Sequence, residues 1–165
     1  MARILAIDPG NTNSGYCIID SETKRAKVFG KAPNRSVMTD IVKGLEYDEA
    51  VIEMVASYGM PVGMTVFETC VWIGRFTQAI EDHYLGCVPV KFLRRQQVKL
   101  NICKSNKATD ATIRQALVDR FDKDASNYGK GTKDAPGWFY GFKADIWQAY
   151  ALGVTYIDLD MCEDW

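Results

Sequence analysis

Three acidic residues lie where the sequence predicts that elements of a folded core begin or end. Asp8 follows the apolar run "RILAI", Glu68 follows "VGMTVF", and Asp145 lies near the start of a C-terminal apolar segment. Desolvating a lone carboxylate is costly, so an acid at the edge of a core needs a partner. Neighbouring strands of a sheet end side by side, and a helix packed across those ends can supply a third acid. The three carboxylates are therefore expected to converge.

Such a cluster predicts a site for divalent cations. Carboxylates held together repel one another unless positive charge neutralises them. Two divalent ions roughly 4 Å apart commonly bind the attacking water and the leaving oxygen in phosphoryl transfer. Oxygen ligands suit Mg²⁺, with Mn²⁺ as a substitute, whereas a single histidine and five cysteines without C-x-x-C spacing offer little to zinc. The turn "DPGNTNSG" after the first strand leaves a second possibility open, because such a turn can also cradle nucleotide phosphates.

The order of elements predicts one α/β domain over residues 1–165. The first three predicted strands have short, turn-rich connections, which indicates an antiparallel meander. No internal repeat or linker divides the chain. Strands are expected at 2–8, 16–20, 26–32, 62–68 and 87–93, and helices at 38–58, 73–86, 94–102, 107–121 and 142–159.

Charge is balanced overall but unevenly distributed. The formal net charge is −1, so the chain as a whole is not a basic nucleic-acid binder. A basic segment nevertheless lies between residues 91 and 114, while the last eight residues carry four acids and no base. A local basic surface beside separate carboxylates is compatible with a nuclease, which must hold a polyanion while coordinating cations. The bases of this segment are Lys91, Arg94, Arg95, Lys99, Lys104, Lys107 and Arg114.

The remaining composition indicates a cytoplasmic protein. No apolar run approaches the roughly 20 residues that a membrane span requires, and the N-terminus shows no secretion signal. The five cysteines are scattered and odd in number, which favours a reducing compartment over a disulfide framework. We expect no membrane association.

Three segments together resemble a known family. "ILAIDPGNTNSGYCIID", "VFE" and "KADIWQAYALGV", in that order and spacing, are similar to the RuvC-like Holliday-junction resolvases, closest in character to those of bacteriophages. The resemblance implies a ribonuclease H-like α/β fold, with a central mixed five-stranded sheet flanked by helices. It also implies a metal-dependent endonuclease acting on four-way junctions, or on forks or flaps, in the cytoplasm of a bacterial host if phage-encoded. A homodimer would make paired symmetric nicks that leave 5′-phosphate and 3′-hydroxyl ends.

The resemblance also assigns roles to individual residues. Asp8, Glu68 and Asp145 match the metal-binding acids of the family, and Lys107 matches a basic position near its active site. Many members carry a further acid three positions after the first in the last helix, where this chain has Gln148. A glutamine can still bind a metal through its carbonyl oxygen, but without charge.

Further residues are expected to contact DNA or a second copy of the chain. A face of the helix after Glu68, formed by Ile73, Phe76 and Ile80, is the expected dimer interface. An aromatic residue near the second acid can stack on a base at an open branch point. The expected DNA-binding residues are Trp72, Arg94, Arg95, Lys99, Lys104 and Lys107.

Two other functions remain open on the sequence. "DPGNTNSG" also resembles the first phosphate loop of actin-like sugar kinases and ATPases, but that family needs a second phosphate loop, and none is found here. The neutral Gln148 favours the other alternative, a protein that binds branched DNA with weak or no catalysis. Product formation from a four-way junction in excess Mg²⁺ or Mn²⁺ separates this binder from a nuclease.

Overall fold

The computed structural model describes residues 1–160 and has one five-stranded sheet at its centre. The strand order is β3-β2-β1-β4-β5. β2 pairs antiparallel with both β1 and β3, while β4 pairs parallel with both β1 and β5, which confirms the expected mixed sheet. The strands are β1 (Arg3–Asp8), β2 (Asn13–Asp20), β3 (Ala26–Pro33), β4 (Glu49–Met54) and β5 (Val90–Arg94).

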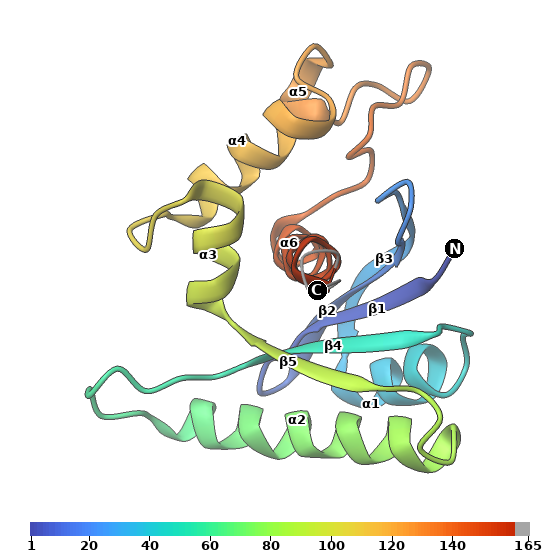
Figure 1. The fold of residues 1–165 in the computed structure, drawn as a ribbon, viewed down its shortest axis with the longest axis vertical. Helices are drawn as coiled ribbons and strands as arrows, with labels where there is room; N and C mark the ends of the chain where they lie inside the picture. Colours follow the sequence, from blue (N-terminus) through green and yellow to red (C-terminus); the bar gives the residue numbers. More distant parts are fainter. Residues whose placement is uncertain (161–165) are drawn as a thin grey trace.

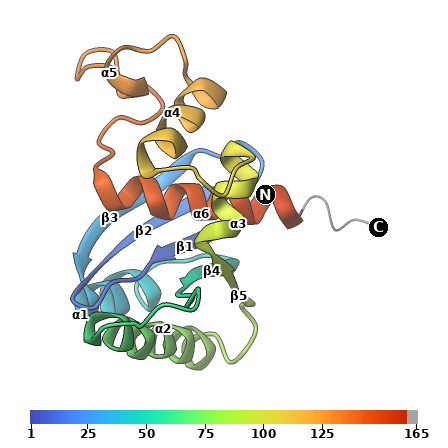
Figure 2. The same cartoon turned by 90° about the vertical axis from the view of Figure 1, so that its left-hand side faces the viewer.

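Helices cover both faces of this sheet. Figure 1 shows α6 end-on above the strands, with α2 running below them. In the perpendicular view of Figure 2, α6 lies lengthwise across the sheet, and α4 and α5 extend beyond it. The helices are α1 (Asn34–Ser36), the π-helical segment η1 (Val37–Val42), α2 (Met64–His83), α3 (Arg95–Cys103), α4 (Asp110–Phe121), α5 (Ser126–Gly129) and α6 (Ala144–Asp160).

Two apolar clusters fill the spaces on either side of the sheet. Ala6 and Val51 belong to the cluster under α6, whereas Leu5, Ile7 and Ile52 belong to the cluster over α2 and η1. β1 and β4 are thus buried on both faces, which explains their nearly continuous apolar sequences. Because successive side chains of a strand point to opposite faces, position along a strand decides which helix a residue meets.

The expected helix at 38–58 is wrong over most of its length. The helical segment ends at Val42, and Glu49–Met54 forms β4 between β1 and β5. A short run of valine and isoleucine with buried neighbours has no periodicity that separates a buried strand from a helix. Pairing with two parallel strands decides the outcome here, and it places Glu53 near the end of a central strand.

The expected strand at 62–68 is also wrong. Pro61 and Gly63 precede α2, which begins at Met64 and continues to His83, so it includes most of the expected helix at 73–86. Its buried residues recur at helical spacing and pack over the sheet. Ile73, Phe76 and Ile80 are 3%, 0% and 0% exposed, so the predicted dimer interface is instead part of the chain's own core.

The other predicted helices are confirmed within a few residues. α4 begins where expected, with the Thr109 side chain accepting a hydrogen bond from the Thr112 backbone at 3.3 Å. The cysteines within residues 1–160 are all free thiols, and Cys162 and the rest of 161–165 lie outside the described residues. Within the described part of the chain, no helix has the length and apolar character needed to cross a membrane.

Candidate active site

A row of neighbouring residues, most of them charged, crosses the sheet near the C-terminal ends of β1 and β4. Asp8 is the cross-strand partner of Gly15, and Gly15 is the partner of Lys31. Ile7 pairs with Ile52, so Asp8 and Glu53 occupy the next positions of adjacent strands, which lie about 4.8 Å apart. Both acids follow residues that face α2, and they therefore face α6.

Gly15 allows the start of α6 to reach this row. A Cβ atom on Gly15 would lie 2.7 Å from the Asp145 carbonyl oxygen and 3.1 Å from its Cβ. The missing side chain lets Asp145, in the first turn of α6, lie over the sheet beside Asp8. Its carboxylate forms an ion pair with Lys31, whose pKa is raised by the hydrogen bond between them. Asp8, Glu53 and Asp145 thus come from three elements and lie near enough for the other two to affect the pKa of Asp8.

Gly15→Ala is expected to separate these elements. The added methyl group meets helix backbone rather than a flexible side chain, so α6 has to shift, at a cost of about 1–3 kcal/mol. Urea unfolding should show this loss, together with a fall in any metal-dependent activity. Gly63→Ala is the matched control, because nothing lies within 4 Å of a Cβ there. Equal stability of the two variants would contradict the close approach of α6.

Burial and neighbouring negative charges raise the pKa of two of these acids, Asp8 and Glu53. Burial, followed by the charges of Glu53 and Asp145, raises the pKa of Asp8 to about 7, with Arg95 opposing the shift. Burial likewise raises the pKa of Glu53, again opposed by Arg95. The Arg95 guanidinium lies 3.6 Å from the Glu53 carboxylate and also binds Asp110. Burial therefore makes ionisation of Asp8 and Glu53 costly, and Arg95 offsets only part of that cost.

The available ligand atoms are oxygens. Glu53 Oε2 and Gln148 Oε1 are buried without a hydrogen-bond partner in the described residues, and Gln148 is 9% exposed. Gln148 follows Asp145 by three residues and so lies on the same side of α6. Hard oxygen donors of this kind fit Mg²⁺ or Mn²⁺.

The geometry of the described residues is not that of a closed metal site. Among residues 1–160, no group of three or more His, Cys, Asp or Glu side chains converges closely enough to hold an ion. Lys31 and Arg95 each contact one of the acids instead. A divalent ion at this site would have to compete with both of these cations.

Glu68 lies outside the row. It is an exposed residue in the second turn of α2, where it accepts a hydrogen bond from the Asn11 side chain at 3.2 Å. The expected position of Glu68 at a strand end is wrong, and Glu53, which was not among the expected residues, lies near the end of β4 instead. The fragment "VIEM" indicates such an acid, since Glu53 lies within a run rich in valine and isoleucine. The interpretation of residues 38–58 as a helix is the reason that Glu53 was not predicted.

The predicted basic residues differ in their positions relative to the acids. Arg95, at the start of α3, contacts Glu53 directly, and Lys99 lies one turn later on the same helix. Arg94 is exposed at the end of β5. Lys104 and Lys107 are exposed in the connection between α3 and α4. These bases on β5, α3 and the α3–α4 connection are called the basic surface below, and Arg95 is its member in contact with Glu53.

Trp72 lies on the other side of the sheet. Its ring packs 5.7 Å from Phe76 and 4.7 Å from the Arg75 guanidinium, in the half-buried margin of the cluster over α2. It is therefore not beside Asp8. Phe67, 57% exposed, is the aromatic residue of α2 next to Glu68.

Solved structures share this arrangement of elements. The RuvC structure of Thermus thermophilus in complex with a Holliday junction substrate superimposes with a TM-score of 0.66, covering 98% of this chain and 97% of that one. The chain has the RuvC fold. A second Thermus thermophilus RuvC structure gives a TM-score of 0.64 over 97% and 96% of the two chains.

The likeness to RuvC lies in structure far more than in sequence. Identity is 16% and 15% for the two Thermus structures. No family model matches the chain, and no curated protein is similar to it in sequence. The likeness covers nearly the full length of both chains.

Proposed function

We propose that this chain is a metal-dependent endonuclease that resolves Holliday junctions or other branched DNA in the cytoplasm. The observation that supports this most directly is that Asp8, Glu53 and Asp145 lie near one another at one edge of a RuvC-like sheet. Acidic side chains that are partly buried and lie close enough to repel one another are typical of sites that bind cations. The Thermus RuvC structure with a Holliday junction substrate supports branched DNA as the substrate class.

Each residue of the row has a separate role in this proposal. Asp8, Glu53 and Asp145 hold the divalent cation, with the Gln148 carbonyl oxygen as a neutral ligand. When bound, such a cation activates water and stabilises charge on a phosphodiester. Lys31 forms an ion pair with Asp145 and holds its carboxylate at the start of α6. Glu68 remains a candidate ligand only if α2 and its Asn11 contact rearrange.

The basic surface would hold the DNA backbone. Lys107 would stabilise negative charge on the scissile phosphate, as the family resemblance implies. Arg94, Lys99 and Lys104 would contact neighbouring phosphates, and each such contact steepens the salt dependence of binding. Arg95 contacts both Glu53 and Asp110, so it links the acids to this surface.

The substrate is tested by a panel of DNA structures. Four-way, three-way, forked and linear duplexes of one sequence are incubated with the protein across a series of Mg²⁺ and Mn²⁺ concentrations. We expect cleavage of the branched substrates only, none in EDTA, and 5′-phosphate ends. Equal cleavage of the linear duplex would contradict selectivity for branches.

The second candidate is a branched-DNA binding protein with weak or no catalysis. Gln148 favours it, because a neutral residue stands where many related enzymes carry an acid, and Lys31 already neutralises Asp145. Tight binding of the four-way junction without product at any metal concentration would support this candidate over the nuclease.

Gln148→Asp tests whether residue 148 meets the metal in the nuclease. An added carboxylate on the same side of α6 as Asp145 increases the negative charge available to a cation. We expect cleavage to reach half its maximum at a Mg²⁺ concentration several-fold lower than for the wild type. Gln148→Ala is the control, and it should raise that concentration. An unchanged Mg²⁺ dependence in both variants would mean that residue 148 does not meet the metal.

Paired nicking requires two active sites, so we propose a two-fold homodimer. The face of α2 that does not pack on the sheet carries Met64, Phe67 and Val71 at helical spacing, 70%, 57% and 55% exposed. Exposed apolar side chains grouped in this way indicate an interaction surface. A second copy of the chain is the partner that two symmetric cuts require.

Phe67→Glu is expected to separate the dimer. A charge within the apolar stripe would be desolvated in the interface, which is strongly unfavourable. Sedimentation equilibrium should show a shift from dimer to monomer, and paired nicks should become single ones. Val28→Glu, at an exposed apolar residue of β3, is the control and should remain dimeric. A wild type that is monomeric with and without junction DNA would contradict the interface.

A further inference from the structure

A lysine at the edge of the sheet supplies a cation to the acids. Lys31 lies on β3, an edge strand, and is the cross-strand partner of Gly15, whose partner on the other side is Asp8. Cross-strand partners share a face of the sheet, so Lys31 faces α6 as Asp8 does. Gly15 has no side chain to separate them, and Lys31 forms an ion pair with Asp145.

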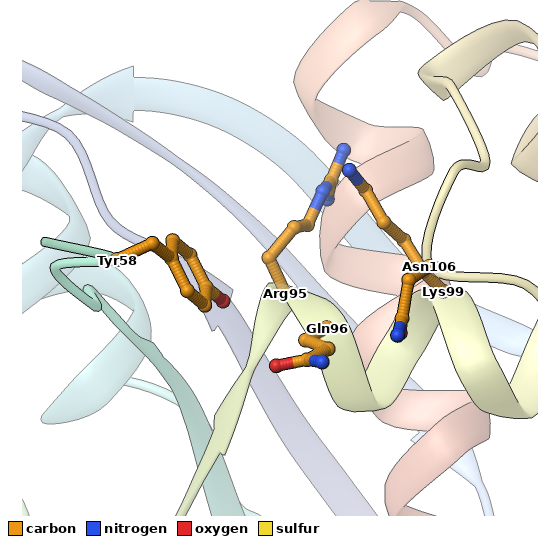
Figure 3. Close-up of a pocket in the computed structure, with 5 residues that line it drawn as sticks. All are labelled: Tyr58, Arg95, Gln96, Lys99 and Asn106. Carbon is orange, nitrogen blue, oxygen red and sulfur yellow. The ribbon is translucent and has the colours of Figure 1, made fainter. Parts of the chain in front are cut away.

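The second cation at the acids is held more firmly. Arg95 contacts both Glu53 and Asp110, and its side chain is 24% exposed. Figure 3 shows this side chain extending from the beginning of α3, away from Tyr58. Two acidic partners and partial burial fix the guanidinium in place. Of the two cations, Lys31 is therefore the one that can move.

A lysine suits a contact that is made and released. Lys31 has Asp145 as its one ion-pair partner within residues 1–160, and its side chain is 53% exposed. Its ammonium is a compact charge on a flexible four-carbon chain, whereas an arginine makes a rigid, two-pronged contact. An ion pair as exposed as this one shifts an equilibrium by only about two- to fivefold. Asp145 can therefore exchange Lys31 for a divalent ion at small cost.

A DNA phosphate is the group that a freed Lys31 would meet. The basic surface borders the acids from β5 and α3, whereas Lys31 borders them from β3, at the opposite edge of the sheet. The Asp145 side chain is 34% exposed, so it is open to a ligand from solvent. A DNA backbone that reaches a cation held by Asp145 therefore arrives beside Lys31. The phosphate offers Lys31 a negative charge in place of the carboxylate it leaves.

We propose that Lys31 pairs with Asp145 in the free protein and passes to a DNA phosphate when a divalent ion binds at Asp145. The inference rests on the proposed nuclease function, to which it adds a coupling between metal and DNA. Lys31 becomes available to DNA once an ion is bound, and Asp145 becomes available to an ion once DNA draws Lys31 away. Such a coupling between two ligands is reciprocal by thermodynamic necessity.

The first measurement is the affinity of the DNA-free protein for Mn²⁺, which does not depend on cleavage. Lys31→Met keeps a side chain of similar length and removes its charge, so it should bind Mn²⁺ about two- to fivefold more tightly than the wild type. Lys31→Arg keeps the charge and should bind no more tightly than the wild type. Lys27→Met, at an exposed lysine near the start of the same strand, is the control and should match the wild type. Unchanged or weaker binding by Lys31→Met would overturn the proposal.

The second measurement follows the charge of Lys31 to DNA. Affinity for a four-way junction is measured over a series of salt concentrations, in EDTA and in Ca²⁺, with denaturing gels confirming that the junction is intact. In Ca²⁺ the slope of log affinity against log salt should be shallower by about one for Lys31→Met than for the wild type, because one phosphate contact is lost. In EDTA the two slopes should coincide, since Lys31 then remains on Asp145. Equal slopes in Ca²⁺, or a difference of the same size in EDTA, would overturn the passage of Lys31 to DNA.

The outcomes separate the role of Lys31 from the nuclease. Tighter Mn²⁺ binding by Lys31→Met, together with the slope difference in Ca²⁺ alone, supports the role of Lys31 even if no DNA is ever cut. Metal-dependent cleavage by the wild type, with Lys31→Met unaltered in both measurements, overturns that role and leaves the nuclease. A wild type that binds no divalent ion overturns both. Circular dichroism of each variant confirms that the fold is intact.

Discussion

Asp8→Asn is expected to abolish cleavage, preserve binding of a four-way junction, and stabilise the metal-free protein above pH 7. The first effect follows from the loss of a charged ligand in the centre of the row of acids. The second follows because the basic residues of α3 and the connection after it are unchanged. The third follows from the burial of Asp8, which makes its ionisation costly, and from the charges of Glu53 and Asp145 beside it, which add to that cost.

The pH dependence of that stabilisation has a definite sign. The pKa of Asp8 is about 7 in the folded chain, against an ordinary value of 3.8. Between these two pH values the folded state retains a proton that the unfolded state has released, so the wild type loses stability as pH rises from about 4 to about 7. The loss is roughly 2–4 kcal/mol, and it stays constant above that range. An asparagine has no such titration.

Urea unfolding of the metal-free wild type and Asp8→Asn at pH 4 and pH 8 measures this difference. The two proteins should be similar at pH 4, and the variant should be more stable at pH 8. Added Mg²⁺ should then stabilise the wild type far more than the variant, because a ligand that binds the folded state raises its stability. A stability difference that does not change between pH 4 and pH 8 would contradict the burial of Asp8 among acids.

Glu53→Gln is expected to reduce cleavage more than about 100-fold, since even residues that only support metal ligands commonly contribute 10–100-fold. Glu68→Gln should retain most of the activity. Glu53 lies next to Asp8 on a paired strand, whereas Glu68 is an exposed residue of α2 bonded to Asn11. The two substitutions are chemically identical, so each controls for the other.

Single-turnover cleavage of a four-way junction, with junction affinity measured in parallel, separates the two glutamates. Affinity should change little in either variant, because neither carboxylate belongs to the basic surface. The reverse pattern, with Glu68→Gln inactive and Glu53→Gln active, would refute the assignment and require α2 to move towards the sheet. A loss in both variants would indicate that Glu68 also contacts the metal or its water.

The sequence was sufficient for the parts of the site that depend on local pattern. Asp8 ends a strand with a continuous apolar interior and precedes a Pro-Gly turn, and Asp145 lies in the first turn of a long apolar helix. Both features are readable within a dozen residues. The mixed five-stranded sheet was expected only through the family resemblance, and the structure confirms it.

The parts that depend on long-range pairing could not be predicted. β4 is a strand because β1 and β5 lie on either side of it, and an isolated run of valine and isoleucine does not reveal that. Glu53 was missed for this reason, and Glu68 took its place. Lys31 and Gly15 were missed because their relevance arises from cross-strand register with Asp8. Only the assembled sheet brings these residues into one row.

The central claim is that Asp8, Glu53 and Asp145 support metal-dependent cutting of branched DNA. The most direct measurement follows a four-way junction with each of its four strands labelled in turn, in Mg²⁺ and in EDTA. For the wild type we predict nicks at symmetric positions in two opposing strands, with 5′-phosphate ends, only when Mg²⁺ is present. We predict none for Asp8→Asn, Glu53→Gln or Asp145→Asn. A junction that is bound but remains intact in Mg²⁺ and Mn²⁺, or one that these three variants still cut, would contradict the claim.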